Sequence, residues 1–145
     1  MPFLPPSSAR TVHVLGDRIA IRLAAADSPS QMTLVTVDVP PGGFIPLCSH
    51  RTEEELYLVL AGELHVRLGA EERALRPGDA VHVPPGTPHA YRNAGPDTAR
   101  FAAVGVGGPL DRFFVEMAEQ VHEMPRDRDA LARVMARYGV HPASA

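Results

Sequence analysis

The 145-residue sequence predicts a single, mainly β domain that ends in two short helices. Between residues 11 and 106, short apolar segments with a period of two, or with a continuous apolar run, alternate with turn-forming residues. After residue 107 the apolar residues change to a spacing of three and four, which is typical of helices. Many short strands with regular turns indicate a sandwich or a barrel.

Eight segments of the β region have the pattern of strands. In chain order they are TVHVL (11–15), DRIAIRLA (17–24), MTLVTVDV (32–39), EELYLVL (54–60), ELHVRL (63–68), AVHVP (80–84), HAYRN (89–93) and ARFAAVGV (99–106). Turn formers such as Gly16-Asp17 and Gly95 to Asp97 separate them. The first ten residues are rich in Pro and Ser, so we expect a flexible arm over residues 1–10 and the barrel over residues 11–106.

The segment 107–145 predicts two helices with one apolar face each. The first places apolar residues at Leu110, Phe113, Phe114, Met117, Val121 and Met124, and the second at Leu131, Val134, Met135 and Tyr138. Pro109 suits a first turn, Pro125 interrupts the pattern, and Gly139 suits a helix end. Because an apolar face needs a partner surface, we expect both helices to pack on the outer face of one sheet.

Composition narrows the functional classes. The formal net charge is −3 and there is no basic block, so neither nucleic acid nor an anionic membrane is an expected partner. The single Cys excludes an intrachain disulfide and fits a reducing compartment. The first residues, MPFLPPSSAR, lack the pattern of a secretory signal, and no apolar run reaches membrane-spanning length. We therefore expect a cytoplasmic protein whose partner is a small molecule.

Four polar residues predict a metal site inside the β domain. Cys48 and His50 are two residues apart, so on a strand both would point to one face. Glu55 opens the next strand, with Glu54 as the alternative carboxylate, and a proline- and glycine-rich turn presents His89. Imidazoles and a carboxylate that converge in a small barrel are typical ligands of a divalent transition metal, and two His with one carboxylate suit non-haem iron.

Two stretches resemble the motifs of the cupin family. The first has the family's spacing over Gly42, Cys48, His50, Glu55 and Gly62, and the second over Gly78, Pro84, Gly86, His89 and Asn93. Only Cys48 departs in type, because the family has His there. The stretches VPPGGFIPL, EEELYLVLAGE and GGPLDRFFVEMAE further resemble small quercetinase-like cupins. The resemblance covers most of the chain after residue 10 and implies a double-stranded β-helix, or jelly-roll, barrel followed by a helical segment over 107–145.

The resemblance also implies a metal set of Cys48, His50, Glu55 and His89. The metal would be Fe, Mn, Ni, Co or Zn, and Glu55 would serve as a ligand or as a catalytic proton acceptor. A Cys sulfur is one bond from Cβ, so on an unmoved backbone it would fall short of the metal. Three states remain open: the thiol is near but unbound, the metal shifts toward sulfur and favours zinc, or metal binding is lost.

Three functions follow from the resemblance. The first is a metal-dependent enzyme of quercetinase-like dioxygenase chemistry, or related natural-product tailoring, on an aromatic or enol-bearing molecule. The second is a non-redox cyclase or isomerase that uses zinc, and the third is a non-enzymatic binding module. We also expect a homodimer, because a covered strand edge is protected from aggregation.

Other residues receive plainer interpretations. The remaining histidines match no ligand position and are expected on the surface or in packing: His13, His65, His82, His122 and His141. Tyr57 and Tyr91 are expected in the core or at a rim. Some of a set of apolar residues should line a pocket on the inward strand faces: Phe44, Leu56, Leu58, Val81, Tyr91 and Phe101.

Overall fold

The computed structural model describes residues 3–143, and its regular elements are mainly strands. The strands are β1 (Arg10–Val14), β2 (Asp17–Leu23), β3 (Met32–Val39), β4 (Phe44–His50), β5 (Glu54–Ala61), β6 (Leu64–Leu68), β7 (Glu71–Leu75), β8 (Ala80–Val83), β9 (His89–Arg92), β10 (Ala99–Val106) and β11 (Val140–Pro142). The helices are α1 (Leu110–Gln120) and α2 (Arg128–Arg137), with short 3-10 turns at Pro6–Ser8 and Ala25–Asp27.

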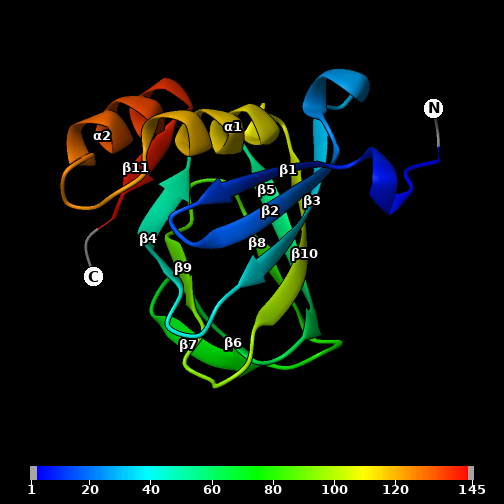
Figure 1. The fold of residues 1–145 in the computed structure, drawn as a ribbon, viewed down its shortest axis with the longest axis vertical. Coiled ribbons are helices and arrows are strands. Elements are labelled where there is room, and N and C mark those ends of the chain that lie inside the picture. Colours follow the sequence, from blue (N-terminus) through cyan, green and yellow to red (C-terminus); the bar gives the residue numbers. More distant parts are fainter. Residues whose placement is uncertain (1–2, 144–145) are drawn as a thin grey trace.

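The strands form two sheets that face each other and enclose the core (Figure 1). One sheet has the order β1-β2-β3-β10-β5-β8 and the other the order β11-β4-β9-β6-β7. Every strand pair is antiparallel. This is the jelly-roll arrangement with two C-terminal helices, so the predicted fold class is confirmed.

All eight predicted strands are present, and three further strands carry weak sequence patterns. In β4, Pro46 interrupts an alternation that would otherwise mark a strand. The edge strand β7 is polar and exposed except for Leu75, and β11 has only three residues. Residues 1–2 and 144–145, the ends of the expected arm and of the helical segment, lie outside the described residues.

Inward-facing residues of both sheets fill the lower part of the barrel. On β3, β5 and β10 every second residue is buried, as expected for strands with one face on a core. The rings of Tyr57, Tyr91 and Phe101 pack together with centroids 5.1 to 6.4 Å apart. This half of the barrel interior is therefore occupied by the protein's own aromatic side chains.

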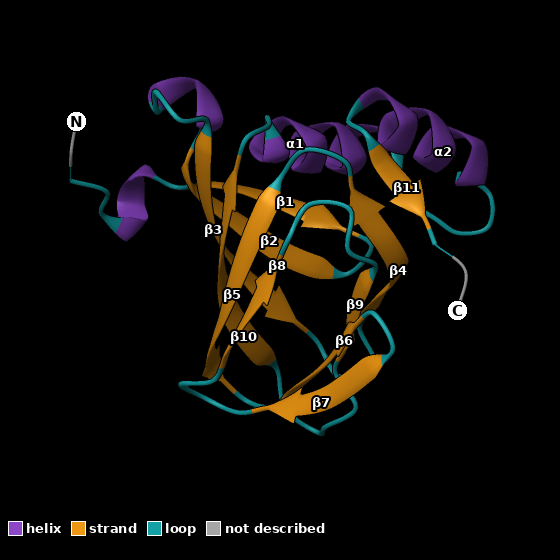
Figure 2. Cartoon of the chain, turned by 180° about the vertical axis from the view of Figure 1, so that it is seen from behind, coloured by secondary structure: helices purple, strands orange, loops and turns teal. Residues whose placement is uncertain are grey.

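The helices close one end of the barrel. Figures 1 and 2 show α1 and α2 lying across that end, above the strands, rather than along the outer face of a sheet as expected. The apolar face of α1 packs with residues of α2, β4 and β11 in a second core cluster: Leu110, Phe113, Met117, Val121, Val134, Met135, Val140 and Cys48. No helix in the described part of the chain is long and apolar enough to cross a membrane.

Candidate metal centre

The end of β4 brings Cys48 and His50 to the interior of the barrel. Both side chains are buried, whereas Ser49 between them is partly exposed, as the two-residue period of a strand requires. Strand β9 lies beside β4 with His89 directly opposite Cys48. A thiol and two imidazoles from different parts of the sequence therefore meet on one inner surface.

Strand β5 decides between the two candidate carboxylates. Glu55 points inward and is 3% exposed. Glu54 points outward, where its carboxylate lies 2.5 Å from Nε2 of His82. The spacing to Gly62 favours Glu55 over Glu54 as the carboxylate of the site, and the geometry agrees with this choice.

The turn before β9 orients His89. The backbone of Gly86 has a φ of +77°, which L-residues with a side chain rarely adopt, and its N–H donates to the carbonyl of His50 at 2.7 Å. Nδ1 of His89 lies 2.9 Å from the carbonyl of Thr87. That contact turns Nε2 of His89 toward the cluster, which is the role that an outer hydrogen bond has for a metal-binding imidazole.

The polar atoms of the cluster converge on one point. Oε2 of Glu55 lies 3.2 Å from Nε2 of His89 and 3.7 Å from Nε2 of His50. The two imidazole rings stack with centroids 5.4 Å apart. Ligand atoms of Cys48, His50 and His89 all lie within 4.8 Å of one another, so these three residues could hold a metal ion.

Several of these buried atoms lack a hydrogen-bond partner. They are Nε2 of His89, Oε2 of Glu55, Nδ1 of His50 and both carboxylate oxygens of Glu53. Buried polar atoms without a partner cost free energy, and they are rare in folded proteins unless a water or an ion satisfies them. A divalent transition metal fits this set, because its preferred ligands are imidazole nitrogen, thiolate sulfur and carboxylate oxygen.

The local electrostatics favour a cation. Burial lowers the pKa of His50, but the proximity of Cys48 and Glu53 and the charge of Glu55 outweigh burial and raise this pKa to about 10. For Glu55, burial raises the pKa, but the proximity of His89 and the charges of both imidazoles hold it below its usual range. The cluster therefore attracts positive charge, which a proton or a metal ion can supply.

Glu53 belongs to the site, although it lies outside the spacing of the two motifs. Its side chain is 1% exposed, and one carboxylate oxygen lies 3.6 Å from Nδ1 of His50. A Cβ on Gly108 would lie 2.7 Å from this carboxylate, so the absence of a side chain there makes room for Glu53. The sequence feature that makes room for Glu53 is Gly107-Gly108. Because this pair lies far from Glu53 in the sequence, the connection is visible only in the folded structure.

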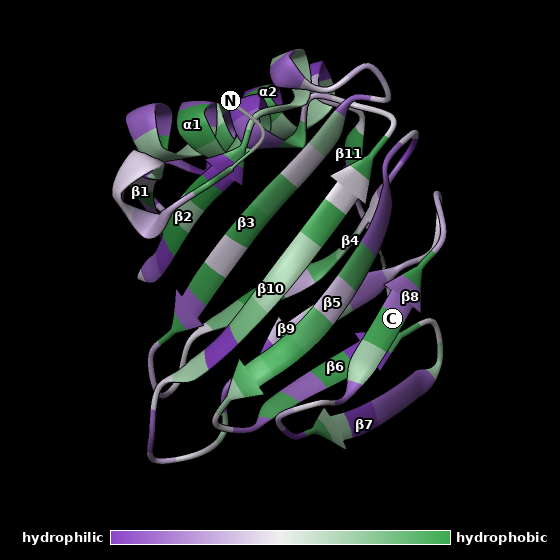
Figure 3. Ribbon diagram, turned by 90° about the vertical axis from the view of Figure 1, so that its right-hand side faces the viewer, coloured by the Kyte–Doolittle hydropathy of each residue, from purple (hydrophilic) through white to green (hydrophobic). Residues whose placement is uncertain are grey.

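Half of the six residues considered for a pocket lining face inward. Val81, Tyr91 and Phe101 lie on the inward faces, opposite or beside the site strands. Leu56 and Leu58 point outward, on the six-stranded sheet whose strands β5 and β10 are largely apolar in Figure 3, and are 46% and 40% exposed, because Glu55 and Tyr57 between them face inward. Phe44, at the start of β4, is also exposed.

The other five histidines do not join the cluster. His13, His82, His122 and His141 are exposed, and His65 is partly buried on β6. Tyr57 and Tyr91 are core residues, and the ring of Tyr57 lies 6.3 Å from that of His89. The packing interpretation of the two tyrosines is therefore correct.

Comparison with known proteins agrees with this fold. Residues 35–105 match the family model of the cupin domain. Quercetin 2,3-dioxygenase of Bacillus subtilis is 33% identical over 93 residues, which are 63% of this chain and 28% of that enzyme. The chain thus spans little more than a quarter of the relative's length.

Two solved structures share the fold. An RmlC-like cupin from Shewanella frigidimarina is 18% identical with a TM-score of 0.67, covering 77% of this chain and 96% of that one. The polyketide cyclase RemF from Streptomyces resistomycificus is 22% identical with a TM-score of 0.61, covering 73% of this chain and 79% of that one. With both motifs, the two-sheet barrel and the family match in agreement, the chain belongs to the cupin superfamily as a small member with a cluster that could bind a divalent metal.

Proposed function

We propose that this cupin is a metal-dependent enzyme that acts on a small aromatic or enol-bearing molecule. The observation that carries the proposal is the buried cluster of Cys48, His50 and His89, with Glu55 3.2 and 3.7 Å from the two Nε2 atoms. Buried atoms without partners are costly, so a protein that keeps several of them together gains most when a cation binds there.

Each residue has a role in this proposal. His50, His89 and the Cys48 thiolate hold the ion, and Glu55 is either a fourth ligand or the acceptor of the substrate's hydroxyl proton. When bound, a divalent metal supplies Lewis acidity that polarises a substrate oxygen. The pKa of Glu55 lies below its usual range, so the side chain is an ionised carboxylate, which suits a metal ligand.

Oxygen chemistry is the first candidate reaction. Its support is the 33% identity to a quercetin 2,3-dioxygenase over 93 residues. Under this candidate the substrate is a planar molecule with an enol hydroxyl, and the reaction consumes oxygen.

A non-redox reaction is the second candidate, and Cys48 favours it. Thiolate is a soft ligand that zinc accepts readily in combination with imidazole. Zinc has no redox chemistry, so the enzyme would then catalyse proton transfer or ring closure, which is the class of the polyketide cyclase that shares the fold.

Metal analysis of protein purified without chelators or an affinity-tag metal tests the proposal. About one equivalent of bound metal per chain is expected, and it should fall to background in the His89→Ala variant. Oxygen uptake with a flavonol by the iron-, manganese-, nickel- or cobalt-loaded protein would support the first candidate. Zinc as the resident metal without oxygen uptake would support the second. A chain that binds no metal would overturn the enzyme proposal and leave a binding module.

A further inference from the structure

The candidate metal centre is closed on the side of the helices. The ring of Phe113, on α1, lies 6.0 Å from the ring of His50 in an edge-on arrangement. Cys48 is 8% exposed and His89 is 1% exposed. On the opposite side the aromatic residues of the lower barrel fill the interior. A substrate therefore needs a different route to these residues.

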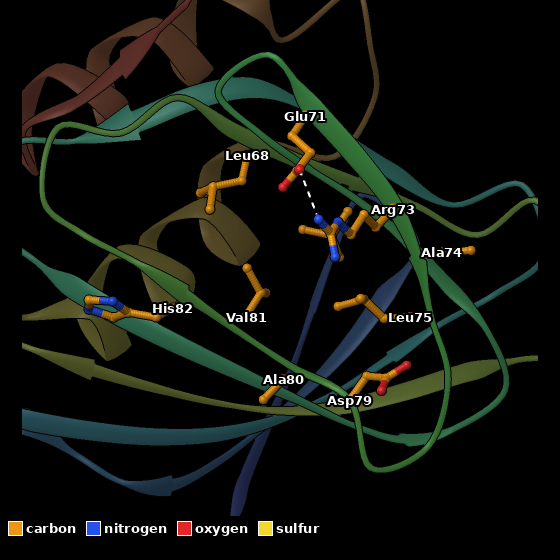
Figure 4. A pocket seen from close by; sticks show the side chains of 10 residues that line it. Leu68, Glu71, Arg73, Ala74, Leu75, Asp79, Ala80, Val81 and His82 are labelled. Atoms are coloured by element: carbon orange, nitrogen blue, oxygen red, sulfur yellow. Dashed lines mark hydrogen bonds and ion pairs between the residues drawn. The ribbon is translucent and has the colours of Figure 1, made fainter.

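A pocket of about 520 Å³ lies between the free edges of the two sheets. Strand β8 is the edge of one sheet and β7 is the edge of the other, so no strand pairs across this gap. The pocket is lined by Val66, Leu68, Leu75 and Val81, with Glu71 and Arg73 among its polar residues. Figure 4 shows Leu68, Leu75 and Val81 extending into the space between the strands.

The pocket adjoins the candidate metal centre through strand pairing. Leu68 lies directly opposite His89, and Val81 lies directly opposite Tyr57. Directly opposite residues share a face of the sheet, and their Cβ atoms are about 4.5 to 5.5 Å apart. One wall of the pocket is thus in contact with the wall of the metal site.

We infer that the small-molecule substrate binds in this pocket and reaches the metal centre sideways, between β7 and β8. The inference rests on the proposed function and adds the location and class of the ligand. The apolar floor suits a flat, largely uncharged ring system. Glu71 and Arg73 already form an ion pair at 2.9 Å, and Asp79 and His82 add further polar groups at the rim that can form hydrogen bonds. The pocket volume is within the range of small-molecule sites, roughly 300 to 1,000 Å³.

Quercetin, a planar enol-bearing probe, tests the inference by fluorescence titration of the metal-loaded and the chelator-treated protein. Val81→Phe, which fills the pocket, should weaken binding about tenfold or more in both forms while metal content stays unchanged. Leu56→Phe is the matched control, because Leu56 lies on the neighbouring strand and points outward.

The outcomes separate the two proposals. Equal binding to wild type and Val81→Phe would overturn the pocket inference and leave the metal proposal standing. Binding that is weakened by Val81→Phe in a protein that takes up none of the offered metals would support the pocket and overturn the enzyme proposal. Absence of binding to the metal-loaded wild type would overturn the ligand class and the pocket together.

Discussion

Two groups of buried polar residues lie within the same barrel and differ in how their hydrogen bonds are satisfied. Asn93 is 2% exposed, and its amide donates to the carbonyls of Val39 and Asp97 at 3.0 and 2.8 Å and accepts from the N–H of Gly95 at 3.0 Å. The group around His50 and His89 is equally buried but has several atoms without partners.

The difference separates a structural role from a functional one. Asn93 and His89 belong to the same motif, and in the sequence they carry equal weight. In the structure, however, the Asn93 side chain links the end of β3 at Val39 to the loop at Asp97. Nε2 of His89, in contrast, faces other buried polar atoms and has no hydrogen-bond partner among the described residues. Burial alone does not identify a site, whereas several unpaired buried atoms gathered together indicate one.

The largest expected effect is on metal binding. We expect His89→Ala to lose bound metal almost completely, because it removes the nitrogen that faces both Glu55 and the thiol side of the cluster. His82→Ala, at an exposed imidazole outside the cluster, should keep the wild-type metal content. Elemental analysis of both variants measures this, and full metal occupancy in His89→Ala would rule out the site.

The next effect is on stability. Asn93→Ala should lower the free energy of unfolding by roughly 2 to 4 kcal/mol, because it leaves buried backbone groups without partners. Metal affinity of the folded protein should remain as in the wild type. Chemical denaturation and metal titration of this variant measure both quantities. A loss of metal at unchanged stability would contradict the division drawn here between the two groups.

Asp17 lies between the two groups, because only one of its carboxylate oxygens has a partner, and its titration makes the stability of the protein depend on pH. Its Oδ2 accepts a hydrogen bond from Tyr91 at 2.5 Å, while its Oδ1 is buried without a partner. Burial raises the pKa of Asp17 to about 6 from 3.8, although the hydrogen bond from Tyr91 opposes the rise. The folded state therefore binds this proton more tightly than the unfolded state.

The consequence is that stability falls as the pH rises from about 4 to about 6, by roughly 2 to 3 kcal/mol from this group, and then stays level. Asp17→Asn should remove this dependence, so it should stabilise the protein at pH 7 and have little effect at pH 4. Denaturation curves across that pH range test the sign. A variant that is less stable than the wild type at pH 7 would show that the ionised carboxylate is needed.

The smallest effect is expected at Glu53. Glu53→Gln should weaken metal binding about tenfold, because a carboxylate beside Nδ1 of a metal-binding imidazole orients the ring and strengthens it as a ligand. Glu54→Gln is the matched control on the exposed side of the chain. Unchanged metal affinity in Glu53→Gln would assign Glu53 to packing alone.

Much of the fold and part of the site could be predicted from the sequence. The alternation in β3, β5 and β10 is clear because each strand has one face on the core. Strand β4 lacks a clear alternation of apolar and polar residues because Pro46 interrupts it. Motif spacing predicted His50, Glu55 and His89 as neighbours. The burial of Glu53 could not be predicted, because it depends on the approach of Gly108 from a distant segment.

The position of the helices was not predictable for a similar reason. Their apolar faces require a partner, but the sequence does not distinguish the outer face of a sheet from the end of the barrel. The helices pack on the end of the barrel, where Cys48 and Val140 supply an apolar surface that contacts the apolar faces of α1 and α2.

The central claim is that the unsatisfied cluster is a metal centre in which Cys48 takes part. X-ray absorption at the edge of the bound metal tests it most directly. The expected result is one sulfur at about 2.3 Å together with nitrogen or oxygen ligands at about 2.0 to 2.2 Å, with the sulfur lost in Cys48→Ser. A bound metal with only nitrogen and oxygen ligands would contradict the role of the thiolate, and a protein that binds no metal would contradict the claim as a whole.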